Sequence, residues 1–213
     1  MKRSLLVTAV AASLASVAAA DSYTDASNDL FDNGFDNLDI TGVSMSDDGS
    51  NLTLAITTRG FQTWTKYMMY FNTTGAGTTS NAWARPVNLT SNIDYYVGSW
   101  VDASTDNAQF WSWGGGSWGQ TGTLTNAVSG NTVTFTFSMA SLGLSAGQTI
   151  YFDVATSGGG NDPGVDHLSR SDLATSGWGS PSTSGDFLAY TTVPTPGAIA
   201  LLGLAGLAGR RRR

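Results

Sequence analysis

The sequence lacks cysteine and glutamate entirely and contains a single histidine. Without cysteine the chain forms no disulfide, no thiolate metal site and no thiol nucleophile, so three kinds of site are excluded at once. Glutamate and lysine favour surface helices, and both are scarce or absent here, whereas threonine, glycine and aromatic residues are abundant. The composition therefore predicts an all-β protein.

Basic residues are nearly absent from the middle of the chain. Six of the ten lysines and arginines lie at the two ends, whereas all 16 aspartates lie between Asp21 and Asp186. Between residues 21 and 192, four basic residues against 16 aspartates give a net charge of -12, compared with -6 for the whole chain. Because such a surface repels phosphate backbones, nucleic acid is excluded as a partner.

The first 20 residues have the three-part layout of a secretory signal peptide. A basic start precedes an apolar stretch, and small residues end the segment before Asp21. Signal peptidase recognises an Ala-x-Ala pattern, which Ala18 and Ala20 supply. The sequence therefore predicts export, with signal peptidase as the first partner.

Residues 193–213 form a second distinct segment. Val193-Pro194-Thr195-Pro196 precedes an apolar run at 197–209, which is followed by Arg210, Arg211, Arg212 and Arg213. As a helix the apolar run spans only about 20 Å, short of the roughly 30 Å hydrocarbon core of a bilayer. The arginines would nevertheless hold such a segment with its C-terminus on the cytoplasmic side.

The order of Val193-Pro194-x-Pro196, a short apolar helix and an arginine run resembles the PEP-CTERM sorting tail. The resemblance implies cleavage by an exosortase-like enzyme after export, transient membrane association through the helix, and delivery to the cell surface or extracellular matrix. Thr195 stands where the family usually has glutamate, which affects the identity of the processing enzyme more than the sorting role. The alternative is a C-terminal anchor that is never cut. The predicted organisation is a signal peptide (1–20), a β-sandwich domain (21–192) and a sorting tail (193–213).

The body shows the period-two alternation of antiparallel strands. Apolar residues alternate with mostly threonine at 52–57 and 132–137, and a similar pattern occupies 149–154. Strands with one dry and one wet face stack as two sheets, so we predict a single antiparallel, jelly-roll-like β-sandwich. Two long loops, 73–92 and 157–185, are where such a scaffold would display a site. Further strands are expected at 38–46, 66–72, 93–102, 108–113, 121–127 and 186–192.

Several segments of the body occur in an order similar to DOMON-like and CBM9-like β-sandwich domains. These segments are the hairpin at 48–53, Trp64 with Lys66-Tyr67, Asn81–Pro86, Asp94–Asp102 and Asp162–His167. The resemblance implies an extracytoplasmic module that binds a sugar and, in some relatives, calcium or haem. It implies no catalytic residues.

Aromatic residues gather in the middle of the chain. Trp111 and Trp113 share one strand face, and Tyr96 and Trp100 share another, by their spacing. If exposed, these rings would form a platform on which sugar rings stack, and the alternative is that they fill the core or cover a sheet edge. The candidate platform consists of Tyr96, Trp100, Trp111, Trp113 and Trp118.

Half of the aspartates fall between residues 21 and 48. Calcium takes six to eight oxygen ligands, so it is the candidate cofactor of this stretch. The predicted ligands are Asp29, Asp32, Asp36 and Asp39, although their spacing does not reproduce an EF-hand loop. The alternative is an acidic, solvated surface that keeps an exported protein soluble. A second group, Asp162, Asp166 and Asp172, carries the same two interpretations.

The single histidine, His167, lies between Asp166 and Ser169. Catalytic groups usually meet from different elements, and no GxSxG or HExxH motif is present. We therefore predict an exported protein that is not an enzyme and whose partner is an extracellular polysaccharide. The alternatives are a purely structural envelope or matrix protein and a secreted hydrolase that uses His167.

Overall fold

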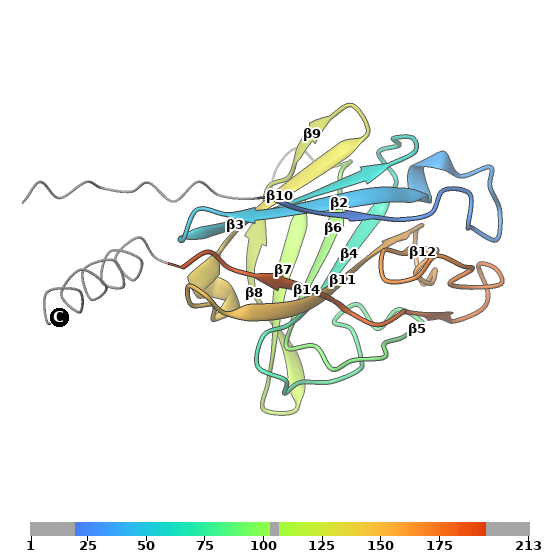
Figure 1. Ribbon diagram of the computed structural model, residues 1–213. Coiled ribbons are helices and arrows are strands. Elements are labelled where there is room, and N and C mark those ends of the chain that lie inside the picture. The colour runs from blue at the N-terminus through green and yellow to red at the C-terminus, as the bar shows by residue number, and fades with distance from the viewer. Residues whose placement is uncertain (1–19, 103–106, 195–213) are drawn as a thin grey trace, which may run out of the picture.

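The computed structural model describes residues 20–102 and 107–194. Within these residues the protein is all-β, and its strands form two antiparallel sheets stacked as a sandwich (Figure 1). The smaller sheet has the order β1 (Asp21–Thr24), β2 (Ile40–Asp47), β3 (Asn51–Thr58), β10 (Thr132–Ser138) and β9 (Ala127–Ser129). The predicted antiparallel β-sandwich is confirmed at this level.

The larger sheet has seven strands. Its order is β12 (Asp166–His167), β11 (Thr149–Ser157), β4 (Lys66–Asn72), β6 (Tyr95–Trp100), β7 (Ala108–Gly114) and β8 (Ser117–Leu124). The short strand β14 (Leu188–Thr191) also pairs with β11, on the edge opposite β4. A separate parallel pair joins β5 (Val87–Asn88) to β13 (Ser182–Thr183). Two short 3-10 turns, η1 (Asp36–Leu38) and η2 (Met139–Leu142), complete the described structure.

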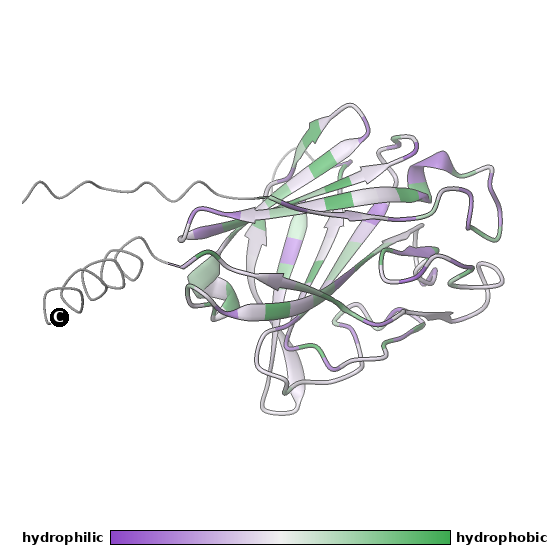
Figure 2. Ribbon diagram, in the orientation of Figure 1, coloured by the Kyte–Doolittle hydropathy of each residue, from purple (hydrophilic) through white to green (hydrophobic). Residues whose placement is uncertain are grey.

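The main core lies between the two sheets and follows the predicted alternation. Leu52, Leu54 and Ile56 of β3 are fully buried, whereas Thr53 and Ala55 between them are partly exposed. Figure 2 shows this as alternating green and pale residues along the strands. The inward residues of β3 and β10 pack with Tyr67, Met69 and Phe71 of the larger sheet.

The outer face of the larger sheet is buried over its middle strands, although the sequence predicted a face exposed to solvent. Strand β4 and the later part of β11, from Phe152 to Ser157, are buried on both faces, because the segments 73–92 and 158–187 fold over them. Met68, Tyr70 and Tyr96 form a second core there with Val87, Leu89 and Ile93. The prediction of one wet face is therefore wrong for the middle of this sheet.

Two buried charged residues fasten the covering segments. The Asp94 carboxylate accepts hydrogen bonds from the backbone N–H and hydroxyl groups of Thr73 and Thr74, at 2.8 to 3.0 Å. Arg85 Nη1 lies 3.0 Å from Ser157 Oγ and 3.1 Å from the Asp162 carbonyl oxygen. Segment 73–92 is thus tied both to the sheet and to segment 158–187.

The β7–β8 hairpin extends beyond the rest of the sandwich at the lower end of the view in Figure 1. Its turn residues Gly115 and Gly116 have φ values of 62° and 86°. Two consecutive positive φ angles define a tight hairpin turn that favours glycine at both positions. The hairpin therefore brings Trp113 and Trp118 opposite each other beside its tip.

The predicted targeting segments lie mostly outside the described residues. Ala18, Pro196 and Arg210 to Arg213 are among the residues not described, whereas Ala20 is exposed and Val193 donates its N–H to Asp47. Within residues 20–102 and 107–194, no helix has the length and apolar character needed to cross a membrane.

Candidate functional site

Five aromatic rings form a continuous row across the outer face of β6, β7 and β8. Trp83 lies 6.1 Å from Trp100 and 5.7 Å from Tyr96, between ring centroids. Trp118 lies 6.3 Å from Tyr96 and 5.5 Å from Trp113. We call Trp100, Trp83, Tyr96, Trp118 and Trp113 the aromatic row.

The row includes three of the predicted platform tryptophans in partly exposed positions. Trp100, Trp113 and Trp118 are half-buried, and Trp111 is half-buried against the second core beside the row. Tyr96, by contrast, is fully buried and offers no face to a ligand, so its assignment to the platform is wrong. The physical reason is that Trp83 covers Tyr96 edge-on.

Trp83 is the member of the row that sequence reasoning missed. A Cβ atom at Gly98 would lie 2.2 Å from its ring, so only glycine lets the indole rest on β6. Trp83 Nε1 donates to Gln109 Oε1 at 2.7 Å, and the Arg85 guanidinium lies 5.3 Å from the ring centroid. A sheet, an amide and a cation therefore hold this loop residue in a defined orientation.

The face also carries unpaired donors. The indole Nε1 atoms of Trp111 and Trp118 are inaccessible and have no acceptor among the described residues. Buried indole N–H groups normally find a partner. Because both atoms are inaccessible, these two N–H groups lie beneath the surface of the row and are not open to a ligand in this arrangement.

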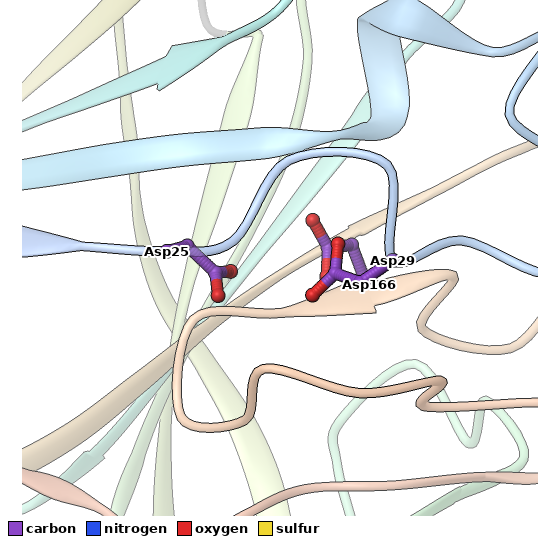
Figure 3. Close-up of side chains that lie close together, drawn as sticks. All are labelled: Asp25, Asp29 and Asp166. Carbon is purple, nitrogen blue, oxygen red and sulfur yellow. The ribbon is translucent and has the colours of Figure 1, made fainter.

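A second feature is a group of three carboxylates, which we call the carboxylate cluster. Asp25 and Asp29 come from the segment after β1, and Asp166 comes from β12. One oxygen of each lies within 4.8 Å of the others, and Figure 3 shows the three side chains turned toward the same space. No histidine belongs to this group.

Among the residues that the structure describes, no basic side chain pairs with a carboxylate of the cluster. Asp166 is 1% exposed, and within residues 20–102 and 107–194 its oxygens accept backbone N–H groups alone, from Ile40 at 2.6 Å and His167 at 2.8 Å. Burial, together with the smaller effects of the Asp29, Asp153 and Asp39 charges, raises the pKa of Asp25 to about 8. Burial also raises the pKa of Asp29 and of Asp166. These carboxylates therefore favour a bound proton or a bound cation.

Of the predicted calcium ligands, only Asp29 belongs to the cluster. Asp32 is exposed and caps the N–H of Gly34, and Asp36 pairs with Arg59 at 2.6 Å. Asp39 is fully buried, with Arg59 Nε 3.2 Å away. The four predicted ligands are not brought together, because Arg59 already neutralises two of them. From the second predicted group only Asp166 joins, since Asp172 pairs with Arg170.

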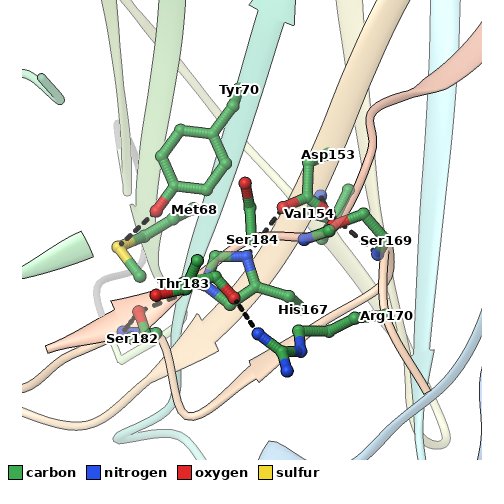
Figure 4. Close-up of polar contacts among 12 residues, drawn as sticks. Met68, Tyr70, Asp153, Val154, His167, Ser169, Arg170, Ser182, Thr183 and Ser184 are labelled. Atoms are coloured by element: carbon green, nitrogen blue, oxygen red, sulfur yellow. Dashed lines mark hydrogen bonds and ion pairs between the residues drawn. The ribbon is translucent and has the colours of Figure 1, made fainter. Parts of the chain in front are cut away.

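His167 lies at the centre of a buried polar network (Figure 4). Its Nδ1 lies 2.7 Å from Asp153 Oδ2 and its Nε2 lies 3.2 Å from Ser182 Oγ. This is the order of a hydrolytic triad, made from residues on β11, β12 and β13 and not from the neighbours Asp166 and Ser169.

The network is nevertheless enclosed. Asp153, His167 and Ser182 are all fully buried, and Tyr70 stacks on His167 at 6.2 Å. The Ser182 hydroxyl also accepts the Gly164 N–H at 3.1 Å. Since no solvent reaches Ser182, a substrate carbonyl has no open side from which to approach its oxygen. The arrangement serves to satisfy buried polar groups beneath segment 158–187.

A cavity of about 280 Å³ opens between the sheets beside β7, β8 and β10. Its lining combines the rings of Tyr95, Phe110 and Phe137 with serine and threonine hydroxyls. The described residues that line it include no carboxylate, histidine, lysine or arginine, so they offer no group for acid–base chemistry and no carboxylate or imidazole for a metal.

Comparison with known proteins assigns no family to the chain. The chain matches no protein-family model and no curated protein.

Proposed function

We propose that the protein is an exported, non-catalytic β-sandwich that binds polysaccharide on the aromatic row. The observation that carries the proposal is the row itself, in which four half-buried tryptophans, joined through the buried ring of Tyr96, extend from β6 to the protruding β7–β8 hairpin. Aromatic faces stack on the apolar faces of sugar rings, and a rigid sheet fixes their spacing.

Charge supports an uncharged or weakly charged glycan as the ligand. The body carries four basic residues against 16 aspartates, so an acidic polymer would be repelled. A neutral glycan meets no such repulsion, and its sugar rings can stack on the partly exposed rings of Trp100, Trp113 and Trp118. The preferred substrate class is therefore a neutral polysaccharide.

The targeting segments support a location outside the cytoplasm. Residues 1–20 have signal-peptide layout, and 193–213 resemble a PEP-CTERM tail with a closing arginine run. The proposed route is export, removal of the signal peptide by signal peptidase, and processing by an exosortase-like enzyme. The destination is the cell surface or extracellular matrix, by way of a membrane-anchored precursor.

The proposal is tested by retention of the purified protein on a panel of insoluble and soluble polysaccharides. We expect retention on a neutral glycan and a loss of affinity of about tenfold or more in Trp113→Ala and in Trp100→Ala. The matched control is Trp64→Ala, because Trp64 is 37% exposed but packs against Phe35, away from the row.

Two outcomes would contradict the proposal. Equal retention of the row variants and of Trp64→Ala would remove the row from the binding site. No retention of the wild-type protein on any polysaccharide would favour a purely structural envelope or matrix protein, whose acidic surface has no specific ligand.

A further inference from the structure

We propose that Asp25, Asp29 and Asp166 bind a calcium ion that fastens the N-terminal segment to the larger sheet. One carboxylate oxygen of each residue lies within 4.8 Å of the others. Because a calcium–oxygen bond is about 2.4 Å long, one calcium ion can bridge oxygens at that separation. The proposal does not depend on the aromatic row, which lies over different strands.

Convergence of acids alone does not define a site, and the buried oxygens of Asp29 supply the second observation. Both Oδ1 and Oδ2 of Asp29 are inaccessible to solvent and accept no hydrogen bond within the described ranges. Oδ2 of Asp25 is in the same state. A buried carboxylate oxygen without a donor loses hydration and gains nothing in return, so such oxygens on two members of the cluster favour the binding of a cation.

Neighbouring groups do not supply that cation. Arg59 already forms ion pairs with Asp36 and Asp39. The hydrogen bonds that Asp166 accepts come from two backbone N–H groups, which carry no net charge. Oδ1 of Asp39 is a further inaccessible oxygen without a donor, on a side chain that is fully buried. The N-terminal segment therefore contributes excess negative charge that the sheet does not balance.

The donor set selects the kind of metal. All three ligands are hard carboxylate oxygens, which suits calcium, magnesium or manganese and disfavours zinc and copper. Magnesium keeps several of its waters and demands a tight octahedron at about 2.1 Å. Calcium accepts several carboxylates and little water, so three converging aspartates, of which Asp166 is buried and Asp25 and Asp29 are half-buried, favour calcium.

A bound ion would join parts of the chain that are far apart in sequence. Asp25 and Asp29 lie between β1 and η1, whereas Asp166 lies on β12 at the edge of the larger sheet. The predicted consequence is a calcium-dependent gain in stability, because the ion binds the folded arrangement and not the unfolded chain.

The test is a calcium titration of the purified protein after EDTA treatment, followed by thermal melting and by calorimetry with CaCl2. We expect one calcium ion per chain and a saturable rise in the melting temperature of about 5 °C or more. Asp29→Asn should abolish the rise. Because it also removes one repelling charge, it should melt at or above the wild-type temperature in EDTA, which separates lost binding from misfolding.

The matched control is Asp32→Asn, since Asp32 is nearby in sequence but exposed and outside the cluster. It should retain the full calcium response. A wild-type protein whose melting temperature is the same in EDTA and in calcium, with no heat of binding, would overturn the proposal. A response to zinc or magnesium that calcium does not reproduce would overturn the choice of metal.

Discussion

At the scale of single residues, the structure separates aspartates that are already balanced from those that are not. Asp94 accepts four hydrogen bonds, and Asp36 and Asp39 share Arg59. Asp25 and Asp29 instead hold buried oxygens without donors. The same residue type therefore fastens a loop in one place and, in our proposal, binds a cation in another.

The unbalanced aspartates predict an unusual dependence of stability on pH when calcium is absent. The pKa of Asp25 is raised from 3.8 to about 8, by burial and by Asp29, Asp153 and Asp39. The folded state therefore holds a proton that the unfolded chain releases at lower pH, so stability is highest at low pH and is lost as the pH rises toward 8.

In EDTA, the melting temperature should fall by at least about 3 °C between pH 5 and pH 8. The fall should be smaller in Asp25→Asn, which carries no titrating group at that position, and smaller in the wild-type protein with calcium. Melting curves recorded across this pH range check the prediction. A melting temperature that rises with pH in EDTA would show that Asp25 is ionised in the folded protein at no cost.

The buried triad illustrates why residue types alone do not predict chemistry. Sequence reasoning placed Asp166 and Ser169 beside His167, whereas the fold supplies Asp153 and Ser182 from other strands. Even with triad order, full burial of Ser182 leaves no path for a substrate. We therefore assign His167 to the support of segment 158–187.

At the scale of elements, the alternation of apolar and polar residues predicted where strands lie better than it predicted which strand faces are buried. Strand 66–72 has the predicted bounds, and 132–138 and 108–114 differ by one residue. The two-residue strands β5, β12 and β13 were missed, because pairing partners distant in sequence define them. Tyr67 to Phe71 form a continuous apolar run, which is typical of a strand buried on both faces and was the available signal.

The two covering segments depend on each other through Arg85. Its guanidinium contacts oxygens of residues 157–162 and lies over the Trp83 ring. Arg85→Met should leave those buried carbonyl groups unsatisfied and release Trp83, which would cost about 2–4 kcal/mol of stability and weaken glycan retention. Chemical denaturation and the retention assay measure the two effects.

The control for Arg85 is Arg170→Met. Arg170 pairs with the exposed carboxylate of Asp172, so its replacement should cost less than about 1 kcal/mol and leave retention unchanged. If Arg85→Met were as stable as the wild-type protein, the link between the covering segments would contribute nothing measurable.

At the scale of the whole molecule, the sequence alone revealed the distribution of charge but not which residues form the carboxylate cluster and the aromatic row. The separation of basic ends from an acidic body requires only counting. Asp25 and Asp166 meet only because β12 pairs with β11 at the sheet edge, and Trp83 joins the row only because a loop folds over Gly98. Such long-range contacts leave no periodic pattern in the chain.

The proposed route of the molecule predicts two cleavages. The mature protein should have lost the segment ending at Ala20 and the arginine run Arg210 to Arg213, because both are read as targeting signals. Intact-mass measurement of protein recovered from the cell surface or medium checks this. A mature chain that still ends at Arg213 would favour the uncut anchor.

The central claim is that glycans contact the aromatic row, and nuclear magnetic resonance of the indole N–H groups tests it most directly. The chain has seven tryptophans: Trp83, Trp100, Trp111, Trp113 and Trp118 lie in or beside the row, and Trp64 and Trp178 lie elsewhere. When a retained polysaccharide is added as oligomers in constant calcium, we predict that signals from the first group shift in a saturable way, whereas those of Trp64 and Trp178 stay in place. Shifts confined to Trp64 or Trp178, or no shifts with a glycan that the protein retains, would contradict the account.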